Sequence, residues 1–231
     1  MGHILLIILS SIIVLTSCAP IKKPPPYQPP PVDDRKIPDF ERIEGKKQRV
    51  IASWYGKDFH GKPTASGEAF NMYAMTCAHR EFPFGTMLYV TNPRNQKTVQ
   101  CTINDRGPFI QGRDLDLSYG SAREIEILGM GVAPVDIEVF GRDNSYVKTV
   151  TGQITTGIMT IQIGSFREES NALRLKAGLD FKYKDVYITE VIIKGVKYYR
   201  VRLGSFRDPK EIKSLARQLA QEGYDTLITT Y

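Results

Sequence analysis

The chain has few of the residues on which metal-dependent and nucleotide-dependent enzymes rely. Only three cysteines and three histidines occur among its 231 residues, and they form no HExxH and no CxxC motif, so a metal centre is not expected. A phosphate-binding loop of the GxxxxGK[ST] kind and a GxSxG nucleophile elbow are also missing. We therefore expect no metal and no cofactor, and any catalysis has to rely on acidic and basic side chains.

Long apolar runs are absent as well. The one strongly apolar stretch, ILLIILSSIIVL at residues 4–15, is shorter than the roughly 20 residues that a spanning helix needs, and it fits the core of a signal peptide. The LTSC that follows resembles the lipobox of bacterial lipoproteins, in which the cysteine is lipidated. We expect a signal peptide over residues 1–17 and a lipid anchor at Cys18. The alternative is an ordinary cleaved signal, and MGHILL lacks the positive residues usual before either.

Proline and charge divide the rest of the chain. Seven of the twelve residues at 20–31 are proline, which favours extended polyproline II and prevents a packed core. Residues 18–48 are therefore predicted to be a tether, with a docking site for a proline-binding partner as the alternative. Residues 51–141 carry 8 basic and 10 acidic side chains, and residues 142–231 carry 15 and 10. This local basic excess indicates an anionic or polar partner for the last part, and no nucleic acid.

Residues 49–141 are predicted to form a small β-barrel. Short strand-like runs such as MLYVTN and TVQCTIND alternate with glycines and turns, and one helical patch lies near residues 121–128. Six motifs occur here in order: SWYG, TASGE, AHR, PFGT, INDRGPF and DLS. Together they resemble the core of the rare lipoprotein A family, which has a six-stranded double-psi β-barrel and acts on bacterial peptidoglycan.

The resemblance implies a lytic transglycosylase. Breaking a glycosidic bond needs a proton for the leaving oxygen, and closure of the muramyl C6 hydroxyl onto C1 removes the need for water. The resemblance makes Asp105 this acid, with its pKa raised by burial or by a nearby carboxylate. Glu68 and His79 are its expected catalytic partners. Trp54 and Tyr55 are expected to stack on sugars.

Simpler interpretations exist for the acidic residues. Asp105 precedes Arg-Gly-Pro and would also suit a turn. Glu68 could be a solvated loop carboxylate and His79 a structural histidine, while Asp114 and Asp116 are expected to brace turns and the barrel. An ion pair between Asp105 and Arg106 would lower the pKa of the acid and oppose its role.

Cys77 and Cys101 stand where the family more often has small or apolar residues. Because strand side chains alternate, Cys77 should share a face with His79, and Cys101 with Asp105. If His79 and Asp105 converge, the cysteines can pair, and a disulfide would contribute roughly 2 to 4 kcal/mol. Two buried thiols are the alternative.

The C-terminal part contains an internal repeat. GSFR begins at residue 164 and again at residue 204, each time after an alternating strand and before an amphipathic helix. The first helix should bury Leu173, Leu175 and Leu179. With further strands near residues 186–191 and 226–230, residues 155–231 are predicted to form a ferredoxin-like βαββαβ domain after a linker at 142–154.

This domain resembles the SPOR domain, a module that binds peptidoglycan strands lacking stem peptides. The resemblance implies that Gln162, Ser165, Phe166 and Arg202 contact sugar. Core packing is the alternative for Phe166.

The whole chain is thus expected to be an envelope lipoprotein that cleaves glycan strands endolytically, most readily those without stem peptides, during wall remodelling or septation. Its partners would be peptidoglycan, a membrane reached through the lipid anchor, and division-site proteins. The membrane would be the outer one, facing the periplasm, in a cell with two membranes, and the cell membrane otherwise. One alternative is a non-catalytic, expansin-like glycan-binding protein. Another is a hydrolase with a second carboxylate near Asp105.

Overall fold

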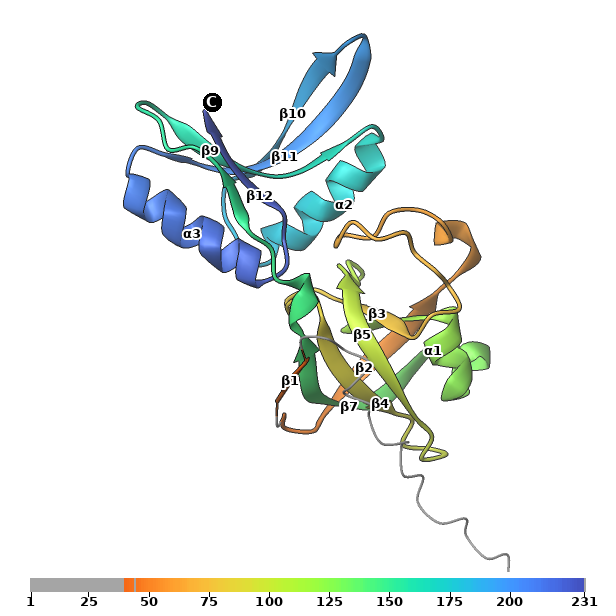
Figure 1. Ribbon diagram of the computed structural model, residues 1–231. Coiled ribbons are helices and arrows are strands. Elements are labelled where there is room, and N and C mark those ends of the chain that lie inside the picture. Colours follow the sequence, from red (N-terminus) through yellow and green to blue (C-terminus); the bar gives the residue numbers. More distant parts are fainter. Residues whose placement is uncertain (1–39, 44, 231) are drawn as a thin grey trace, which may run out of the picture.

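The computed structural model describes residues 40–43 and 45–230, which form two domains (Figure 1). The predicted signal peptide, Cys18 and most of the predicted tether lie outside these residues. In the described ranges, no helix combines the length and the apolarity needed to cross a bilayer.

The first domain is a closed barrel of six strands. Their order around the barrel is β7-β2-β6-β3-β5-β4, and pairing of β4 with β7 closes it. The pairs β2–β6 and β3–β5 are parallel, and the other pairs are antiparallel. This confirms the predicted six-stranded barrel. The strands are β2 (Gln48–Tyr55), β3 (Thr76–His79), β4 (Thr86–Thr91), β5 (Thr98–Asp105), β6 (Leu115–Ser118) and β7 (Val132–Asp143), and β1 (Phe40–Arg42) pairs with β7 outside the barrel.

Alternation of apolar side chains explains these strands. In β6, the buried Leu115 and Leu117 point into the barrel, and the acidic residues on either side of Leu115 point away from it. The helix predicted near residues 121–128 is α1 (Tyr119–Glu124), which begins and ends earlier than predicted. It begins at Tyr119 because Ser118 caps it: the Oγ of Ser118 accepts a hydrogen bond from Ser121 N at 3.0 Å. Short 3-10 helices lie within this domain, η2 (Lys57–Phe59) and η3 (Leu128–Met130), and in the segment that follows it, η4 (Asn144–Tyr146).

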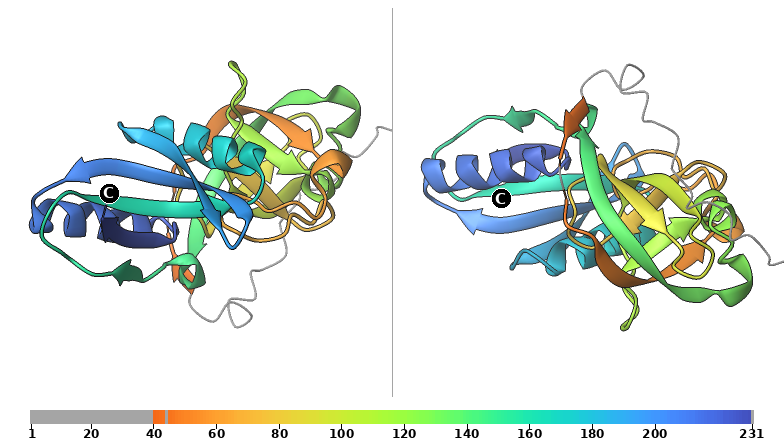
Figure 2. Two further views of the ribbon diagram at one scale, coloured as in Figure 1. Left: turned by 90° about the horizontal axis from the view of Figure 1, so that it is seen from above. Right: turned by 90° about the horizontal axis from the view of Figure 1, so that it is seen from below.

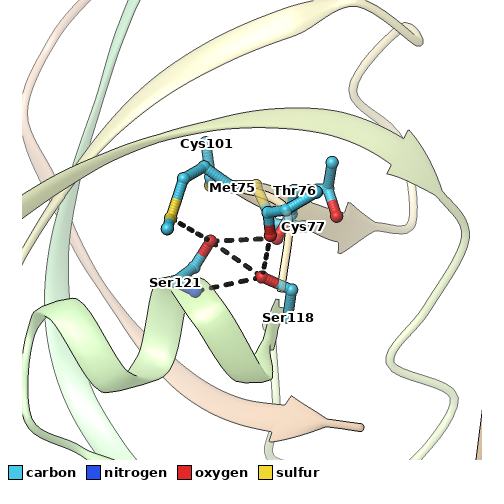
Figure 3. The surroundings of a disulfide bond; sticks show 7 residues. Met75, Thr76, Cys77, Cys101, Ser118 and Ser121 are labelled. Carbon is cyan, nitrogen blue, oxygen red and sulfur yellow. Dashed lines mark hydrogen bonds between the residues drawn. A yellow bond between two sulfur atoms is a disulfide. The ribbon is translucent and has the colours of Figure 1, made fainter. Parts of the chain in front are cut away.

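A disulfide joins Cys77 of β3 to Cys101 of β5 inside the barrel, with their Cα atoms 5.9 Å apart (Figure 3). Both cysteines are buried. Ser121 of α1 lies beside them, and its hydroxyl donates to Thr76 O at 3.3 Å and to Met75 Sδ at 3.8 Å. The disulfide joins the neighbouring strands β3 and β5, and the hydrogen bonds of Ser121 attach helix α1 to the start of β3.

The predicted βαββαβ order of the second domain is confirmed. Its five-stranded sheet has the order β10-β11-β9-β12-β8, and both helices pack on one face of it (Figures 1 and 2). Strand β8, inside the segment predicted as a linker, adds to the sheet edge by parallel pairing with β12. The elements are β8 (Val150–Gly152), β9 (Met159–Phe166), α2 (Glu169–Asp180), β10 (Val186–Ile193), β11 (Val196–Phe206), α3 (Pro209–Gln221) and β12 (Thr226–Thr230).

The repeated GSF sequence has a steric basis. A Cβ atom at Gly164 would lie 2.6 Å from the ring of Phe166, and one at Gly204 would lie 2.3 Å from the ring of Phe206. In each repeat the phenylalanine ring therefore folds back over a glycine that has no side chain. The prediction that α2 buries Leu173 is wrong, because this side chain is 51% exposed and only the rest of the predicted stripe faces the sheet.

The two domains share a packed interface at the ends of α2 and α3. The side chain of Phe84 is fully buried, and its ring meets that of Tyr224 edge to face, with centroids 5.0 Å apart. Phe84 N donates to Glu222 O at 3.0 Å, and a Cβ at Gly223 would lie 2.8 Å from Phe84 Cβ. This contact, called the Phe84 interface below, fixes the second domain against the barrel.

Candidate active site

A cleft of about 220 Å³ opens where strands β2, β5 and β6 of the barrel approach helix α2 of the second domain. Three strands each contribute a polar side chain: Tyr55 ends β2, Asp105 ends β5, and Asp116 lies within β6. The complete lining consists of Tyr55, Phe59, Ala78, Asp105, Arg106, Gly107, Pro108, Phe109, Ile110, Arg113, Asp116 and Arg174.

Asp105 is a buried carboxyl in this cleft, with only 6% of the residue exposed. Its Oδ1 accepts hydrogen bonds from Ala65 N at 2.9 Å and Arg106 N at 2.8 Å. Burial raises the pKa of Asp105 above its ordinary value, although these bonds and the charges of Arg174 and Arg106 oppose the shift. Asp105 therefore holds its proton to a higher pH than an exposed carboxyl would.

Arg106 does not form the ion pair that would oppose an acid role. Its guanidinium points away into the Phe84 interface, lying 3.7 Å from the Phe84 ring centroid. Its Nε donates to the hydroxyl of Tyr224 at 2.5 Å, and its Nη1 donates to Phe82 O at 3.0 Å. The residue beside the candidate acid thus belongs to the interface between the domains.

Asp116 is a second carboxyl in the cleft, which sequence reasoning assigned to bracing. Ala78 pairs with Asp105 on one side and with Asp116 on the other, so the two Cα atoms lie two strand spacings apart, or about 10 Å. Asp116 accepts from the hydroxyl of Ser53, and from Arg113 Nη2 at 3.5 Å. Burial raises its pKa too. The sequence contained one signal for this position: Asp116 alternates with two buried leucines of β6, so its side chain points away from the barrel interior.

Asp114 does brace the barrel. Its Oδ2 accepts from Ile51 N at 3.0 Å, and its Oδ1 pairs with Arg80 Nη2 at 3.2 Å. This carboxylate, just before β6, therefore links β2 to the residue that follows β3, outside the cleft lining.

Two polar atoms lining the cleft are buried and unsatisfied. The hydroxyl of Tyr55 and Nε of Arg113 have no hydrogen-bond partner in the described part of the chain. Burial and the charges of Asp105 and Asp116 raise the pKa of Tyr55, so its hydroxyl remains a donor. An unsatisfied buried donor costs about 1 to 3 kcal/mol. Both atoms are suited to bind a polar ligand in the cleft.

Glu68 lies outside the cleft lining and holds the loop beside Asp105. Its carboxylate accepts from Asn104 Nδ2 and from the Tyr146 hydroxyl, each at 2.7 Å. Its backbone oxygen accepts from Thr64 N at 2.7 Å. These bonds fix the Thr64–Glu68 loop, whose Ala65 N donates to Asp105.

His79 also lies outside the cleft lining. Its Nδ1 accepts from the backbone N of Glu81 and of Phe82, both at 3.1 Å, and its ring stacks on Phe82. Burial and the charges of Arg106 and Arg80 lower the pKa of His79 to about 4. The neutral ring thus organises the turn after β3.

This depressed pKa predicts a stability change in acid. An unfolded histidine has a pKa near 6.5, so between pH 6.5 and 4 the unfolded chain binds a proton that the folded chain does not. We expect the unfolding free energy of the wild type to decrease over this range, and His79→Gln to lack that part of the decrease. Urea unfolding at several pH values measures it, with His60→Gln as the matched control. Equal slopes in wild type and His79→Gln would contradict the assignment.

Trp54 does not reach the cleft. Its Nε1 donates to Leu128 O at 3.3 Å and its ring meets Tyr119 edge to face. Of the two aromatic residues predicted to stack on sugar, only Tyr55 lines the cleft. The exposed rings of Phe59 and Phe109, which sequence reasoning missed, lie there with it.

Three of the four predicted sugar contacts of the second domain line two depressions, and Arg202 lines neither. Gln162 and Ser165 line one of about 290 Å³ beside β12. Phe166 lines another of about 300 Å³, which faces the loop of Glu68 across the domain boundary. Arg202 pairs with Gln162 in the sheet, and its Nη1 donates to Thr230 O at 3.4 Å. The two depressions share residues 163–165 and Asp225, and the second one reaches residues 63–67 of the barrel.

Comparison with known proteins gives the same two domains. Residues 47–137 match the family described as Lytic transglycolase, and residues 155–230 match the SPOR domain. The Endolytic peptidoglycan transglycosylase RlpA of Campylobacter jejuni is 37% identical over 197 residues, which cover 78% of this chain and 71% of that protein. The Vibrio cholerae protein of the same name is 33% identical, covering 80% and 73%.

Among solved structures, the RlpA SPOR domain from Pseudomonas aeruginosa covers 32% of this chain and 99% of its own, with 25% identity and a TM-score of 0.29. The identities to the Campylobacter and Vibrio proteins extend through both domains and most of each chain. The chain therefore belongs to the RlpA family.

Proposed function

We propose that this protein is an endolytic peptidoglycan transglycosylase, the activity named for its Campylobacter and Vibrio relatives. It cleaves the β-1,4 bond between N-acetylmuramic acid and N-acetylglucosamine. The observation that carries the proposal is Asp105, a buried carboxyl of raised pKa that lines a cleft beside two unsatisfied donors.

Asp105 acts first as an acid and then as a base. Its proton passes to the glycosidic oxygen as the C1–O4 bond breaks and the muramyl ring becomes oxocarbenium-like. The resulting carboxylate takes the proton of the C6 hydroxyl while O6 bonds to C1. The products are a free 4-hydroxyl and a 1,6-anhydro end, and Asp105 regains its proton.

The neighbouring groups support this step. Tyr55 donates its unsatisfied hydroxyl to the sugar, and Glu68 keeps Ala65 N directed at Asp105. Asp116, fixed by Ser53 and Arg113, stabilises the positive charge that develops at C1. In a hydrolase of the same shape Asp116 would instead activate water, which makes product chemistry the deciding test.

The second domain holds the enzyme on peptidoglycan through Gln162, Ser165, Phe166 and Arg202. Linking a binding domain to the barrel raises the effective substrate concentration at the cleft. The protein works in the cell envelope, facing the periplasm. A lipid anchor at Cys18, strands without stem peptides as substrate, and partners at the division site complete the proposal. The relatives' names favour this function over an expansin-like binder.

Product analysis tests the proposal. The full chain is incubated with amidase-stripped peptidoglycan and with intact peptidoglycan, and the products are identified by mass spectrometry. We expect 1,6-anhydro ends, which are lighter by one water than reducing ends. Reducing ends would establish a hydrolase, and retained binding without any product would establish a glycan-binding protein.

A further inference from the structure

Helix α2 of the second domain forms one wall of the cleft. A Cβ at Gly178 would lie only 2.8 Å from Cβ and Cγ of Arg106, so the missing side chain lets the helix approach the residue next to Asp105. Just beyond the helix end, Phe181 stacks on Phe109 of the cleft with centroids 6.0 Å apart, and the Arg80 guanidinium lies over Phe181. The view in Figure 1 shows α2 facing the segment that follows β2.

Arg174 lies one helical turn before Gly178, on the same side of α2. It lines the cleft together with Asp105 and Asp116, and its guanidinium lies 5.1 Å from the ring centroid of Phe59. It makes no hydrogen bond or ion pair with any residue that the structure describes. The site in the barrel thus contains a cation from the other domain with unused hydrogen-bonding capacity.

The other two arginines of the cleft already have side-chain partners, although Nε of Arg113 is unsatisfied. Arg106 is buried against Phe84 and bonded to Tyr224, and Arg113 pairs with Asp116. A guanidinium has five N–H donors in a planar fork that matches a carboxylate. Arg174 therefore offers an anionic ligand a complete bidentate contact within the cleft.

The proposed substrate contains one such anion. In a glycan strand without stem peptides, the lactyl group of each muramic acid ends in a free carboxylate, whereas a stem peptide converts that group into a neutral amide. The N-acetyl and hydroxyl groups of the strand are neutral. Building on the function proposed above, we infer that Arg174 binds this carboxylate and makes the second domain part of the site that selects strands without stem peptides.

The contact also has an electrostatic consequence for Asp105. The charge of Arg174 lowers the pKa of Asp105, against the effect of burial. A bound carboxylate would offset that charge and help Asp105 to keep its proton. Substrates with a free carboxylate would therefore bind more tightly and meet a better acid.

Paired substrates test the inference. Amidase-stripped strands are compared with the same strands after their muramyl carboxylates have been converted to methylamides, and kcat/KM is measured from 1,6-anhydro ends. We expect the wild type to prefer the free carboxylate by about tenfold, and Arg174→Gln to lose that preference, chiefly through slower cleavage of the substrate with free carboxylates. Arg217→Gln, which removes the same charge from the exposed side of α3, should behave like the wild type.

The pH profile gives a second readout. On the methylamide substrate, the alkaline limb of kcat/KM should move to higher pH in Arg174→Gln, because Asp105 loses a neighbouring positive charge. A full preference for the carboxylate in Arg174→Gln would overturn the inference. An equal loss on both substrates would also overturn it, since that result indicates a merely structural arginine.

Failure of the proposed activity would be recognised separately, as absence of anhydro ends from the wild type on every substrate. In that case a binding measurement tests the role of Arg174 without relying on catalysis. The affinity of an N-acetylglucosaminyl-muramyl tetrasaccharide with free carboxylates is measured by calorimetry for Asp105→Asn and for Asp105→Asn with Arg174→Gln. About tenfold weaker binding by the double variant supports the role of Arg174, and equal binding refutes it.

Discussion

Asp105→Asn is expected to reduce the formation of 1,6-anhydro ends by about a thousandfold or more, the largest loss of any single substitution in this chain. General acid–base catalysis contributes roughly 10² to 10⁴ in rate, and here one residue performs both proton transfers. An amide can neither donate the proton to the leaving oxygen nor take one from the C6 hydroxyl. Single-turnover cleavage of amidase-stripped strands measures the loss without interference from product release.

The same variant should fold well. Its amide oxygen can still accept the hydrogen bonds from Ala65 N and Arg106 N that Asp105 Oδ1 accepts now. Because burial raises the folded-state pKa of Asp105, the stability from its bound proton is present at low pH and is lost as pH rises through that pKa. At pH 7 the neutral amide avoids this loss. We therefore expect Asp105→Asn to have a Tm at pH 7 no lower than that of the wild type, with the advantage disappearing below pH 4.

Asp116→Asn distinguishes a transglycosylase from a hydrolase. In a transglycosylase it should slow the reaction by a smaller factor than Asp105→Asn and leave the anhydro product unchanged. Equal losses from the two substitutions, together with reducing ends from the wild type, would mean that Asp116 activates water and that the assignment of Asp105 as sole proton-transfer group is wrong.

The fold was largely predictable because it follows from local patterns. Alternating side chains and turns predicted the barrel strands, and the repeated GSF predicted two strand–helix units. Alternation does not extend reliably to the site, since the β3–β5 register shifts between Cys77 and Ala78, just where Asp105 joins the cleft. Leu173 shows a similar limit. The sequence pattern predicts that every leucine of this amphipathic helix is buried, but the position of the sheet decides which of them it covers.

The site was only partly predictable. Motif resemblance found Asp105, and the structure places it in a cleft. The other two predicted catalytic residues, Glu68 and His79, instead bind backbone and loop groups outside the cleft lining. Arg174 carried no signal at all, because its place beside Asp105 depends on how two separately recognisable domains dock. A sequence pattern describes each domain and contains little information about the surface between them.

The Phe84 interface between the two domains is the basis of the second large expected effect, a loss of stability. Phe84→Ala should lower the unfolding free energy by about 3 to 5 kcal/mol, because it removes a fully buried ring that contacts Tyr224, Arg106 and the backbone of Gly223. Urea unfolding followed by Trp54 fluorescence for the barrel and by far-ultraviolet circular dichroism for both domains measures it. We expect the two signals to coincide in the wild type and to separate in Phe84→Ala, since the interface couples the domains.

Leu88→Ala is the matched control. Leu88 is equally buried but lies inside the barrel, so its truncation should cost a similar amount without separating the two unfolding signals. Tyr224→Phe is the milder test, as it removes only the hydroxyl that accepts from Arg106 Nε. Coincident transitions in Phe84→Ala would mean that contacts other than the Phe84 interface couple the domains.

Loosening this interface should also affect substrate choice, because the position of Arg174 depends on how α2 docks beside Arg106. At a temperature where every variant is folded, Phe84→Ala should lose most of the roughly tenfold preference for free muramyl carboxylates, whereas Leu88→Ala should keep it. Combining Phe84→Ala with Arg174→Gln should then cost no more of this preference than Arg174→Gln alone, since both changes remove the same contact. Additive losses in the double variant would show that Phe84 and Arg174 act on substrate selection by separate routes.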